Sequence, residues 1–277
     1  MSAVSSTSPQ RSAAAEPSKP FRIGSVSFLN ARPLIAGLDE DSRVKLSLEV
    51  PSKLLDGLRQ RRYETALLPV IDYQRLEGLT IIPAGGIGSD GETLTVRVFS
   101  RVPIERISRV ACDTDSHTSV ALVKAILVER YGLSPQFSDL SEAHDAETML
   151  LIGDKVVCEA PVGYPHQLDL GEAWKTLTGL PFVFAVWTTQ HTTDLHGLYE
   201  TLHAAHSRGM QRIEAIVREF AIPLGWPAAL ARKYLTEHLT FDVGKREIEA
   251  IRLFHHKAYA HGVLNTSPRS LAVFESE

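Results

Sequence analysis

The hydrophobic residues of this chain follow two periods that alternate from Phe21 onward. Helical spacing appears in "SKLLDGLRQRRY" (52–63), where Leu54, Leu55 and Leu58 share one face. Pro51 and Ser52 mark the start of this helix. Short β-rich runs lie on either side of this segment: "FRIGSVS" (21–27), "VKLSLEV" (44–50), "TALLPV" (65–70) and "LTIIPAGGI" (79–87). The order strand, helix, strand predicts an α/β protein with a mostly parallel sheet.

A second series with the same alternation follows. Its helix, "SVALVKAILVERYG" (119–132), ends at Gly132, a residue type that favours the left-handed conformation of a helix end. Its predicted strands are "TLTVRVFS" (93–100), "RVACDT" (109–114), "TMLLIGDKVV" (148–157) and "LPFVFAVWTT" (180–189). From about His196 to His261 the apolar spacing is mainly helical.

Two such series favour two α/β lobes, between which the chain crosses twice. We expect lobe 1 to comprise residues 21–96 plus 188–277, and lobe 2 to comprise residues 97–187. Residues 1–20 are rich in Ser, Ala and Pro and are predicted to form a disordered leader. A ligand cleft between the lobes follows, because strand ends and helix starts point into it. A single continuous α/β domain is the alternative that periodicity leaves open.

Composition argues against two classes of partner, nucleic acid and membranes. The 277 residues are 44% hydrophobic and 22% charged, with a net charge of −4 and scattered Lys and Arg, so no basic surface for nucleic acid is indicated. No apolar run is long enough to cross a membrane, and the leader lacks the apolar centre of a secretory signal. We therefore expect a cytoplasmic protein with no nucleic-acid or membrane partner. The sequence does not specify its oligomeric state.

The cysteines and histidines do not indicate a metal site. Cys112 and Cys158 have no ligand motif around them and are expected to be buried thiols in a reducing compartment. Of the eleven histidines, His203 and His206 share a helical face, which we expect to be solvated because no further ligand accompanies them. The sequence also has no GxSxG or HExxH motif.

The first candidate for chemistry is "RIGSVSFLNARPLI" (22–35). Three small polar side chains, Ser25, Ser27 and Asn30, stand where a strand passes into a helix. Pro33 suits the first turn of that helix, and free N–H groups at a helix start favour an anion. Two interpretations of Asn30 stay open at this point: a helix N-cap or a ligand contact.

The second candidate is "CDTDSHTSVALVKAIL" (112–127), where a strand ends and a helix is expected to begin near Thr118 or Ser119. Hydroxyls and free N–H groups at a helix start can bind a carboxylate without a formal positive charge, and His117 can add one. Capping of the helix by Ser116 or Thr118 is the alternative. The stretch does not match a P-loop.

The glycine-rich stretch "AGGIGSDGETLTV" (84–96) precedes a predicted strand rather than a helix, so it is not a dinucleotide-binding motif. It is either a turn that brings the backbone close to a ligand or a plain loop between strands. Without further information, the residues indicate a two-lobed protein that binds a small anion.

Six segments carry a family resemblance, in order between about residues 22 and 264. They are "SVSFLNARPL", "VPSKLLDGL", "ALLPVIDY", "HTSVALVKAILVERYG", "LLIGDKVV" and "DLGEAWKTLTGLPFVFAVW". Together they resemble the chorismate dehydratase family of the futalosine route of menaquinone biosynthesis. The resemblance implies a type II periplasmic-binding-protein-like α/β fold. It also implies a carbon–oxygen lyase that converts chorismate to 3-[(1-carboxyvinyl)oxy]benzoate and water with no cofactor and no metal.

The resemblance also implies site residues. Asn30 matches the catalytic asparagine of the family motif, and Thr95 stands where relatives usually have a catalytic serine. The Thr95 hydroxyl can still form hydrogen bonds, but its methyl takes up space and stiffens the side chain. His117 stands where an arginine is common, so a permanent charge becomes a titratable one. The substrate-binding candidates are Ser25, Ser27, Ser89, Ser116, His117, Thr118, Ser119 and Gly153.

Chorismate is a dianion, so its two carboxylates need binding in a slightly negative protein. Because no motif supplies an obvious Asp, Glu or His to the site, our hypothesis is that the substrate's own enolpyruvyl carboxylate is the base. The alternative, from another functional class, is a non-catalytic two-lobed protein that binds a small carboxylate. Thr95 favours that alternative, whereas Asn30 and its flanking motif favour the enzyme.

Overall fold

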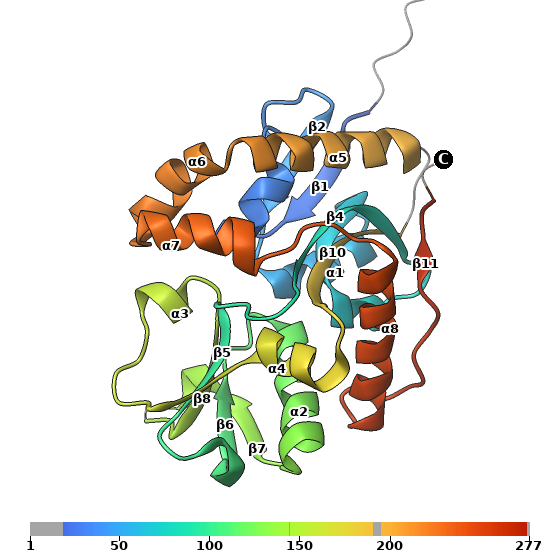
Figure 1. The fold of residues 1–277 in the computed structure, drawn as a ribbon. Helices are drawn as coiled ribbons and strands as arrows, with labels where there is room; N and C mark the ends of the chain where they lie inside the picture. Colours follow the sequence, from blue (N-terminus) through green and yellow to red (C-terminus); the bar gives the residue numbers. More distant parts are fainter. Residues whose placement is uncertain (1–18, 144, 191–194, 276–277) are drawn as a thin grey trace, which may run out of the picture.

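The computed structural model describes residues 19–143, 145–190 and 195–275. The predicted leader therefore lies almost entirely outside the described residues. Two sheets lie one above the other in Figure 1, with helices packed around both. No helix within the described ranges is long and apolar enough to cross a membrane.

The six-stranded sheet has the order β11-β4-β10-β3-β1-β2. Its strands are β1 (Phe21–Ser25), β2 (Val44–Leu48), β3 (Thr65–Pro69), β4 (Thr80–Ser89), β10 (Phe182–Thr189) and β11 (Ala272–Val273). All neighbours pair in parallel except β10, which runs antiparallel to both β3 and β4. One long antiparallel strand thus lies in an otherwise parallel sheet.

The five-stranded sheet has the order β7-β6-β8-β5-β9. Its strands are β5 (Val96–Ser100), β6 (Arg109–Cys112), β7 (Gln136–Asp139), β8 (Thr148–Ile152) and β9 (His166–Asp169). Here β5 is the antiparallel strand, between β8 and β9. The chain therefore passes from the first sheet to the second between β4 and β5, and it returns between β9 and β10.

The helices connect and cover these strands. The α-helices are α1 (Pro51–Arg59), α2 (His117–Tyr131), α3 (Lys155–Cys158), α4 (Leu170–Thr178), α5 (Leu195–Gln211), α6 (Ile213–Ile216), α7 (Ala228–Lys233) and α8 (Lys245–Ala260). The 3-10 helices are η1 (Leu29–Ile35), η2 (Val70–Arg75), η3 (Ile104–Arg106), η4 (Leu140–Glu142) and η6 (Ile222–Leu224), and two π-helical turns are η5 (Val217–Ala221) and η7 (Tyr234–His238).

The sequence boundary at 187/188 divides β10, whereas the strand pairing places all of β10 in the six-stranded sheet. The return crossing thus comes before Phe182. The reason is that β10 pairs along its whole length with β3 and β4, a long-range pairing that periodicity does not reveal. The assignment of the remaining residues to two lobes stays a prediction.

Three other sequence expectations need correction. The predicted strand 148–157 ends at Ile152, because Gly153 has a φ of +64° and α3 follows. Pro33 is the fifth residue of η1 and not part of its first turn. Cys158 is exposed at the end of α3, whereas Cys112 is buried as expected.

The first part of the glycine-rich stretch, residues 84–89, belongs to β4, and residues 90–95 connect β4 to β5. The N–H groups of Gly86 and Gly88 donate to the carbonyls of Phe241 and Thr240, each over 2.9 Å. A Cβ at Gly86 would come within 2.8 Å of Val243 Cγ2, and a Cβ at Gly88 within 3.0 Å of Thr240 Oγ1. The glycines therefore let the segment after η7 lie directly against the sheet.

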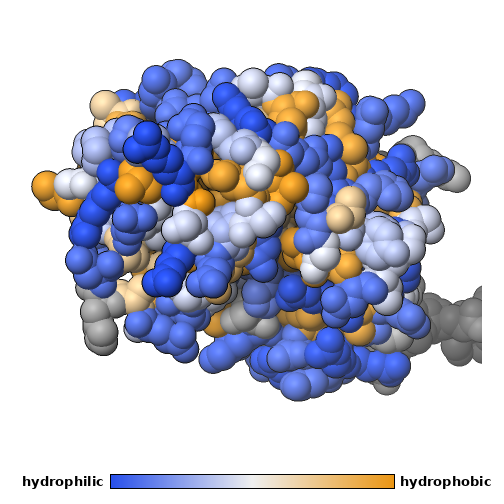
Figure 2. Space-filling view, turned by 90° about the horizontal axis from the view of Figure 1, so that it is seen from below, coloured by the Kyte–Doolittle hydropathy of each residue, from blue (hydrophilic) through white to orange (hydrophobic). Residues whose placement is uncertain are grey.

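The buried hydrophobic residues form one main cluster that includes side chains from both sheets. Trp174 of α4, Phe182 of β10 and Phe254 of α8 meet edge to face there, with ring centroids 5.0–5.9 Å apart. All three rings are fully buried, so the two sheets share an aromatic core beside the return crossing. The face seen from below is mostly hydrophilic, with smaller apolar patches (Figure 2).

Candidate functional site

A pocket lies between the two sheets. Its walls come from the end of β1, η1, β3, β4, the start of β5, the start of α2, the end of β8, β10 and η7. Apolar side chains such as Phe28, Leu67, Ile87 and Phe184 form much of the lining. The polar lining residues are Asn30, Thr93, Thr95, Ser116, Ser119 and Tyr234. An apolar lining with a few polar groups is typical of a small-molecule site.

Neutral groups make up the polar part of this cavity. Among the described residues that line it, Tyr234 carries the one titratable side chain, and none is an Asp, Glu, His, Lys or Arg. Burial raises the pKa of Tyr234, against the opposing effect of the polar side chains of Thr95 and Asn30. The phenol is therefore neutral at physiological pH, and the cavity itself carries no charged side chain.

Asn30 lies in the first turn of η1 and lines the cavity. The N-cap of η1 is Phe28, so Asn30 is not the cap that one sequence interpretation required. The Oδ1 atom of Asn30 is buried and has no hydrogen-bond partner among the described residues. A buried acceptor without a partner is costly, which favours the interpretation of Asn30 as a ligand contact.

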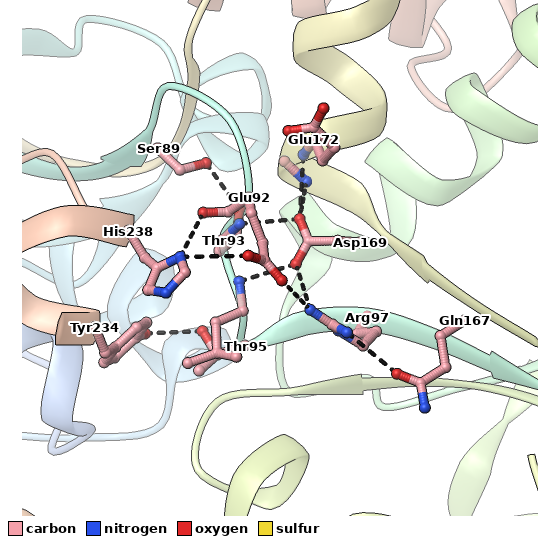
Figure 3. A network of polar contacts seen from close by, with 12 residues as sticks. Ser89, Glu92, Thr93, Thr95, Arg97, Gln167, Asp169, Glu172, Tyr234 and His238 are labelled. Atoms are coloured by element: carbon pink, nitrogen blue, oxygen red, sulfur yellow. Dashed lines mark hydrogen bonds and ion pairs between the residues drawn. The ribbon is translucent and has the colours of Figure 1, made fainter. Parts of the chain in front are cut away.

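Thr95 lies at the start of β5, fully buried, with its hydroxyl 2.8 Å from the Tyr234 hydroxyl (Figure 3). The Tyr234 ring stacks on Trp226 with centroids 5.0 Å apart. The carbonyl of Thr95 accepts the N–H of Gly153 over 2.8 Å. Thr95 is thus fixed through both its main chain and its side chain.

Ser116 and Ser119 line the cavity at the N-terminus of α2. Ser116 is the N-cap, and its Oγ accepts the N–H of Ser119 over 3.2 Å. The predicted capping by Ser116 is therefore present, and both serines also face the cavity. Gly153, at the end of β8, completes the group of predicted residues that line it.

His117 and Thr118 do not line the cavity. The Nδ1 atom of His117 lies 3.1 Å from both carboxylate oxygens of Asp72 and 3.0 Å from the Arg75 guanidinium. Thr118 is fully buried, and its hydroxyl accepts the N–H of Ile71 over 3.4 Å. Both residues attach α2 to η2. Successive residues of a helix point in different directions, so Ser116 and Ser119 line the cavity while His117 and Thr118 face η2.

Three further predicted residues, Ser25, Ser27 and Ser89, are also absent from the lining. Ser25 is buried in β1 and donates to the Val26 carbonyl, and Ser27 is exposed. The Ser89 hydroxyl, at the end of β4, is paired with that of Thr93 over 2.7 Å. The hydroxyls of Ser25 and Ser89 thus form hydrogen bonds with neighbouring residues.

Sequence reasoning missed two polar residues of the lining, Thr93 and Tyr234, of which Tyr234 is the more distant from any motif. Tyr234 lies in a helical region with no motif, 139 positions from its partner Thr95. Only the folded chain brings the two together. In the part of the chain that the structure describes, no cluster of three His, Cys, Asp or Glu side chains is arranged to hold a metal ion.

Comparison with known proteins gives one family and one fold. A family model described as menaquinone biosynthesis matches residues 21–260. The curated chorismate dehydratase of Thermus thermophilus is 30% identical over 246 residues, which cover 78% of this chain and 88% of that protein.

Solved structures share the fold at low identity. A protein from Archaeoglobus fulgidus superposes with a TM-score of 0.71 at 16% identity, covering 90% of this chain and 100% of that chain. The periplasmic aliphatic sulphonate binding protein of Escherichia coli gives 0.63 at 13% identity, covering 94% and 96%. The alkanesulfonate-binding protein of Xanthomonas axonopodis pv. citri gives 0.65 at 14% identity, covering 92% and 97%. The predicted two-lobed, periplasmic-binding-protein-like fold is confirmed.

Proposed function

The chain belongs to the menaquinone-biosynthesis family, and from this premise we propose that it dehydrates chorismate to 3-[(1-carboxyvinyl)oxy]benzoate. The observation that carries the proposal is the cavity: it is mainly apolar, none of its described lining residues is charged, and Asn30, whose buried amide oxygen has no partner among the described residues, is one of them. An apolar wall suits a ring that becomes aromatic, and a neutral hydrogen-bonding group suits a departing hydroxyl.

The reaction breaks two bonds between ring carbons and their substituents. The C3–H bond releases a proton, the C4–O bond releases hydroxide, and the two combine to give water as the ring becomes aromatic. Asn30 accepts a hydrogen bond from the C4 hydroxyl and so orients it for departure. The Thr95 hydroxyl, paired with Tyr234, is a second group that hydrogen-bonds the substrate.

The base is the enolpyruvyl carboxylate of the substrate itself. Support comes from the lining of the cavity, in which no described residue supplies a carboxylate or an imidazole. The Tyr234 phenol is no substitute, because its raised pKa keeps it protonated. The carboxylate takes the C3 proton and passes it to the leaving hydroxide, so it is regenerated in each turnover.

The carboxylate on the substrate ring is held at the start of α2. The positive end of the helix dipole and the hydroxyls of Ser116 and Ser119 meet the cavity there. This arrangement needs no buried Lys or Arg. It suits a protein whose net charge is −4 and whose field does not attract an anion from a distance.

The test is to mix the purified protein with chorismate and to follow the products by chromatography with mass detection. We expect an aromatic product lighter than chorismate by one water, and we expect Asn30→Ala to lower kcat about a hundredfold. Ser207→Ala, on the exposed face of α5, is the matched control and keeps full activity.

Two outcomes would count against the proposal. Saturable chorismate binding without a product would identify a carboxylate-binding protein. Full turnover by Asn30→Asp, with a new carboxylate titrating in the rate profile, would contradict substrate-assisted proton transfer.

A further inference from the structure

The segment between β4 and β5, residues 90–95, contains a strained residue next to the site. Leu94 has a φ of +71°, a backbone conformation that residues other than glycine rarely adopt. Thr95 follows it directly. Strain of this kind persists only where the surroundings hold it in place.

The carboxylate of Asp169, at the end of β9 next to β5, holds this segment (Figure 3). Its Oδ1 accepts the N–H of Thr93 and its Oδ2 accepts the N–H of Leu94, each over 2.9 Å. Arg97 donates to the same Oδ2 over 3.3 Å. The Asp169 side chain is only 8% exposed, so these charge-assisted hydrogen bonds are little weakened by water.

Asp169 is at the same time the N-cap of α4. Its Oδ1 also accepts the N–H groups of Gly171 and Glu172, over 3.0 and 3.1 Å. A Cβ at Gly171 would lie 1.9 Å from Thr93 Oγ1 and 2.5 Å from the Gly91 carbonyl oxygen. The first turn of α4 therefore lies directly on the segment, and only glycine fits at that contact.

We propose that Asp169 is a positioning residue of the site: by accepting the Leu94 N–H on Oδ2, it holds Leu94 in the left-handed conformation and so directs the Thr95 hydroxyl to Tyr234 and the cavity. The effect on catalysis rests on the proposed function. The first residue of "DLGEAW" thereby acquires a role in the site, although it does not line the cavity.

The two carboxylate oxygens have different partners, which makes Asp169→Asn a selective test. The amide oxygen can replace Oδ1 and keep the N–H groups of Thr93, Gly171 and Glu172, so the cap of α4 survives. The amide nitrogen then takes the place of Oδ2, where it faces the N–H of Leu94 and the Arg97 guanidinium and can accept from neither. The substitution removes the hold on Leu94 and leaves the helix intact.

The expected result for Asp169→Asn is a kcat lowered about ten- to a hundredfold, with KM changed less than about threefold, because substrate binding at α2 is untouched. Amide hydrogen exchange measured by NMR should become faster at Leu94 and stay slow at Gly171. Asp139→Asn is the control: Asp139 caps η4 through the N–H of Ser141 and lies outside the cavity. It should change neither readout.

A second substitution tests the mechanism by rescue. Glycine adopts the φ of Leu94 without restraint, so Leu94→Gly added to Asp169→Asn should restore most of the lost kcat. Unchanged exchange at Leu94 in Asp169→Asn, or a double variant as slow as Asp169→Asn, would overturn the proposal. If the wild-type protein does not convert chorismate, the proposed function fails. In that case the positioning role is tested without activity, by comparing the amide exchange of Leu94 and the methyl resonance of Thr95 between wild type and Asp169→Asn. A change in both supports the role.

Discussion

At the scale of single residues, the site depends on hydrogen bonds between neutral groups. The Tyr234 hydroxyl is fully buried and is paired with Thr95, and burial keeps its pKa high. The Asn30 amide oxygen is buried without a partner. In an apolar cavity such groups interact more strongly than in water, and an unpaired one costs more. Single hydroxyls and amides are therefore the sensitive points of this site.

The pair of Thr95 and Tyr234 gives a prediction. Thr95→Val keeps the shape but leaves the Tyr234 hydroxyl buried without its partner. It should lower kcat about ten- to a hundredfold and destabilise the fold by about 1–3 kcal/mol. Thr95→Ser should stay within about threefold of wild-type kcat, because the hydroxyl remains. Thr236→Val, at an exposed position of η7, is the control in the chorismate assay and in denaturant unfolding. A fully active Thr95→Val would remove the hydroxyl from the mechanism.

At the scale of elements, short helices are held in place by polar contacts with longer ones. His255 of α8 bridges both ends of η2: its Nε2 donates to the Val70 carbonyl over 2.7 Å, and its Nδ1 accepts from the Gln74 amide over 2.9 Å. Both ring nitrogens are satisfied in the neutral form of the imidazole. The junction of α8 with η2 therefore depends on an uncharged histidine.

This junction predicts loss of stability in acid. Burial lowers the pKa of His255 from 6.5 to about 4. Between these values the unfolded chain binds a proton that the folded protein does not, so stability falls as pH drops from 6.5 to 4, by about 3 kcal/mol from this group. His255→Gln should flatten that dependence in denaturant unfolding at several pH values, whereas His256→Gln, at the exposed neighbouring position, should not. Equal slopes for wild type and His255→Gln would contradict the assignment.

At the scale of the whole molecule, the two sheets are connected on both sides of the cavity. The aromatic core of Trp174, Phe182 and Phe254 joins them beside α8. On the other side, where α3 and α7 face each other in Figure 1, the Trp226 indole N–H donates to Asp154 over 3.0 Å. The second contact puts a half-buried carboxylate between the sheets, next to Gly153 of the cavity.

The Asp154 contact gives a prediction with a definite sign. Burial raises the pKa of Asp154, against the opposing effect of its Trp226 hydrogen bond. The folded protein thus favours the protonated form, so stability falls as the pH rises from the ordinary value of 3.8 through the raised pKa. Asp154→Asn keeps an acceptor for Trp226 and should raise the Tm slightly at pH 7. The gain should disappear as the pH falls below the ordinary value of 3.8. A lower Tm at pH 7, measured by thermal unfolding, would show that the carboxylate is stabilising.

The sequence by itself determined the features that depend on neighbouring residues. Hydrophobic periods placed α1, α2 and most strands, because side-chain direction repeats locally along a helix or strand. Gly132 ends α2 with a φ of +67°, as its type indicated. The polar turns after β1 and before α2 marked Asn30, Ser116 and Ser119, which line the cavity. The family resemblance marked Thr95 as a site residue.

The tertiary structure decided what depends on contacts between distant segments. Strands β7 and β9, of four residues each, are too short and polar to show a period. The Asn30 oxygen is unpaired, and His117 turns toward Asp72, only because of what the fold places around them. Asp169 reaches Leu94 from 75 positions away, and Thr95 meets Tyr234 from 139. Local sequence sets which groups are available, but long-range packing sets which of them face one another, because burial and pairing are properties of the folded chain.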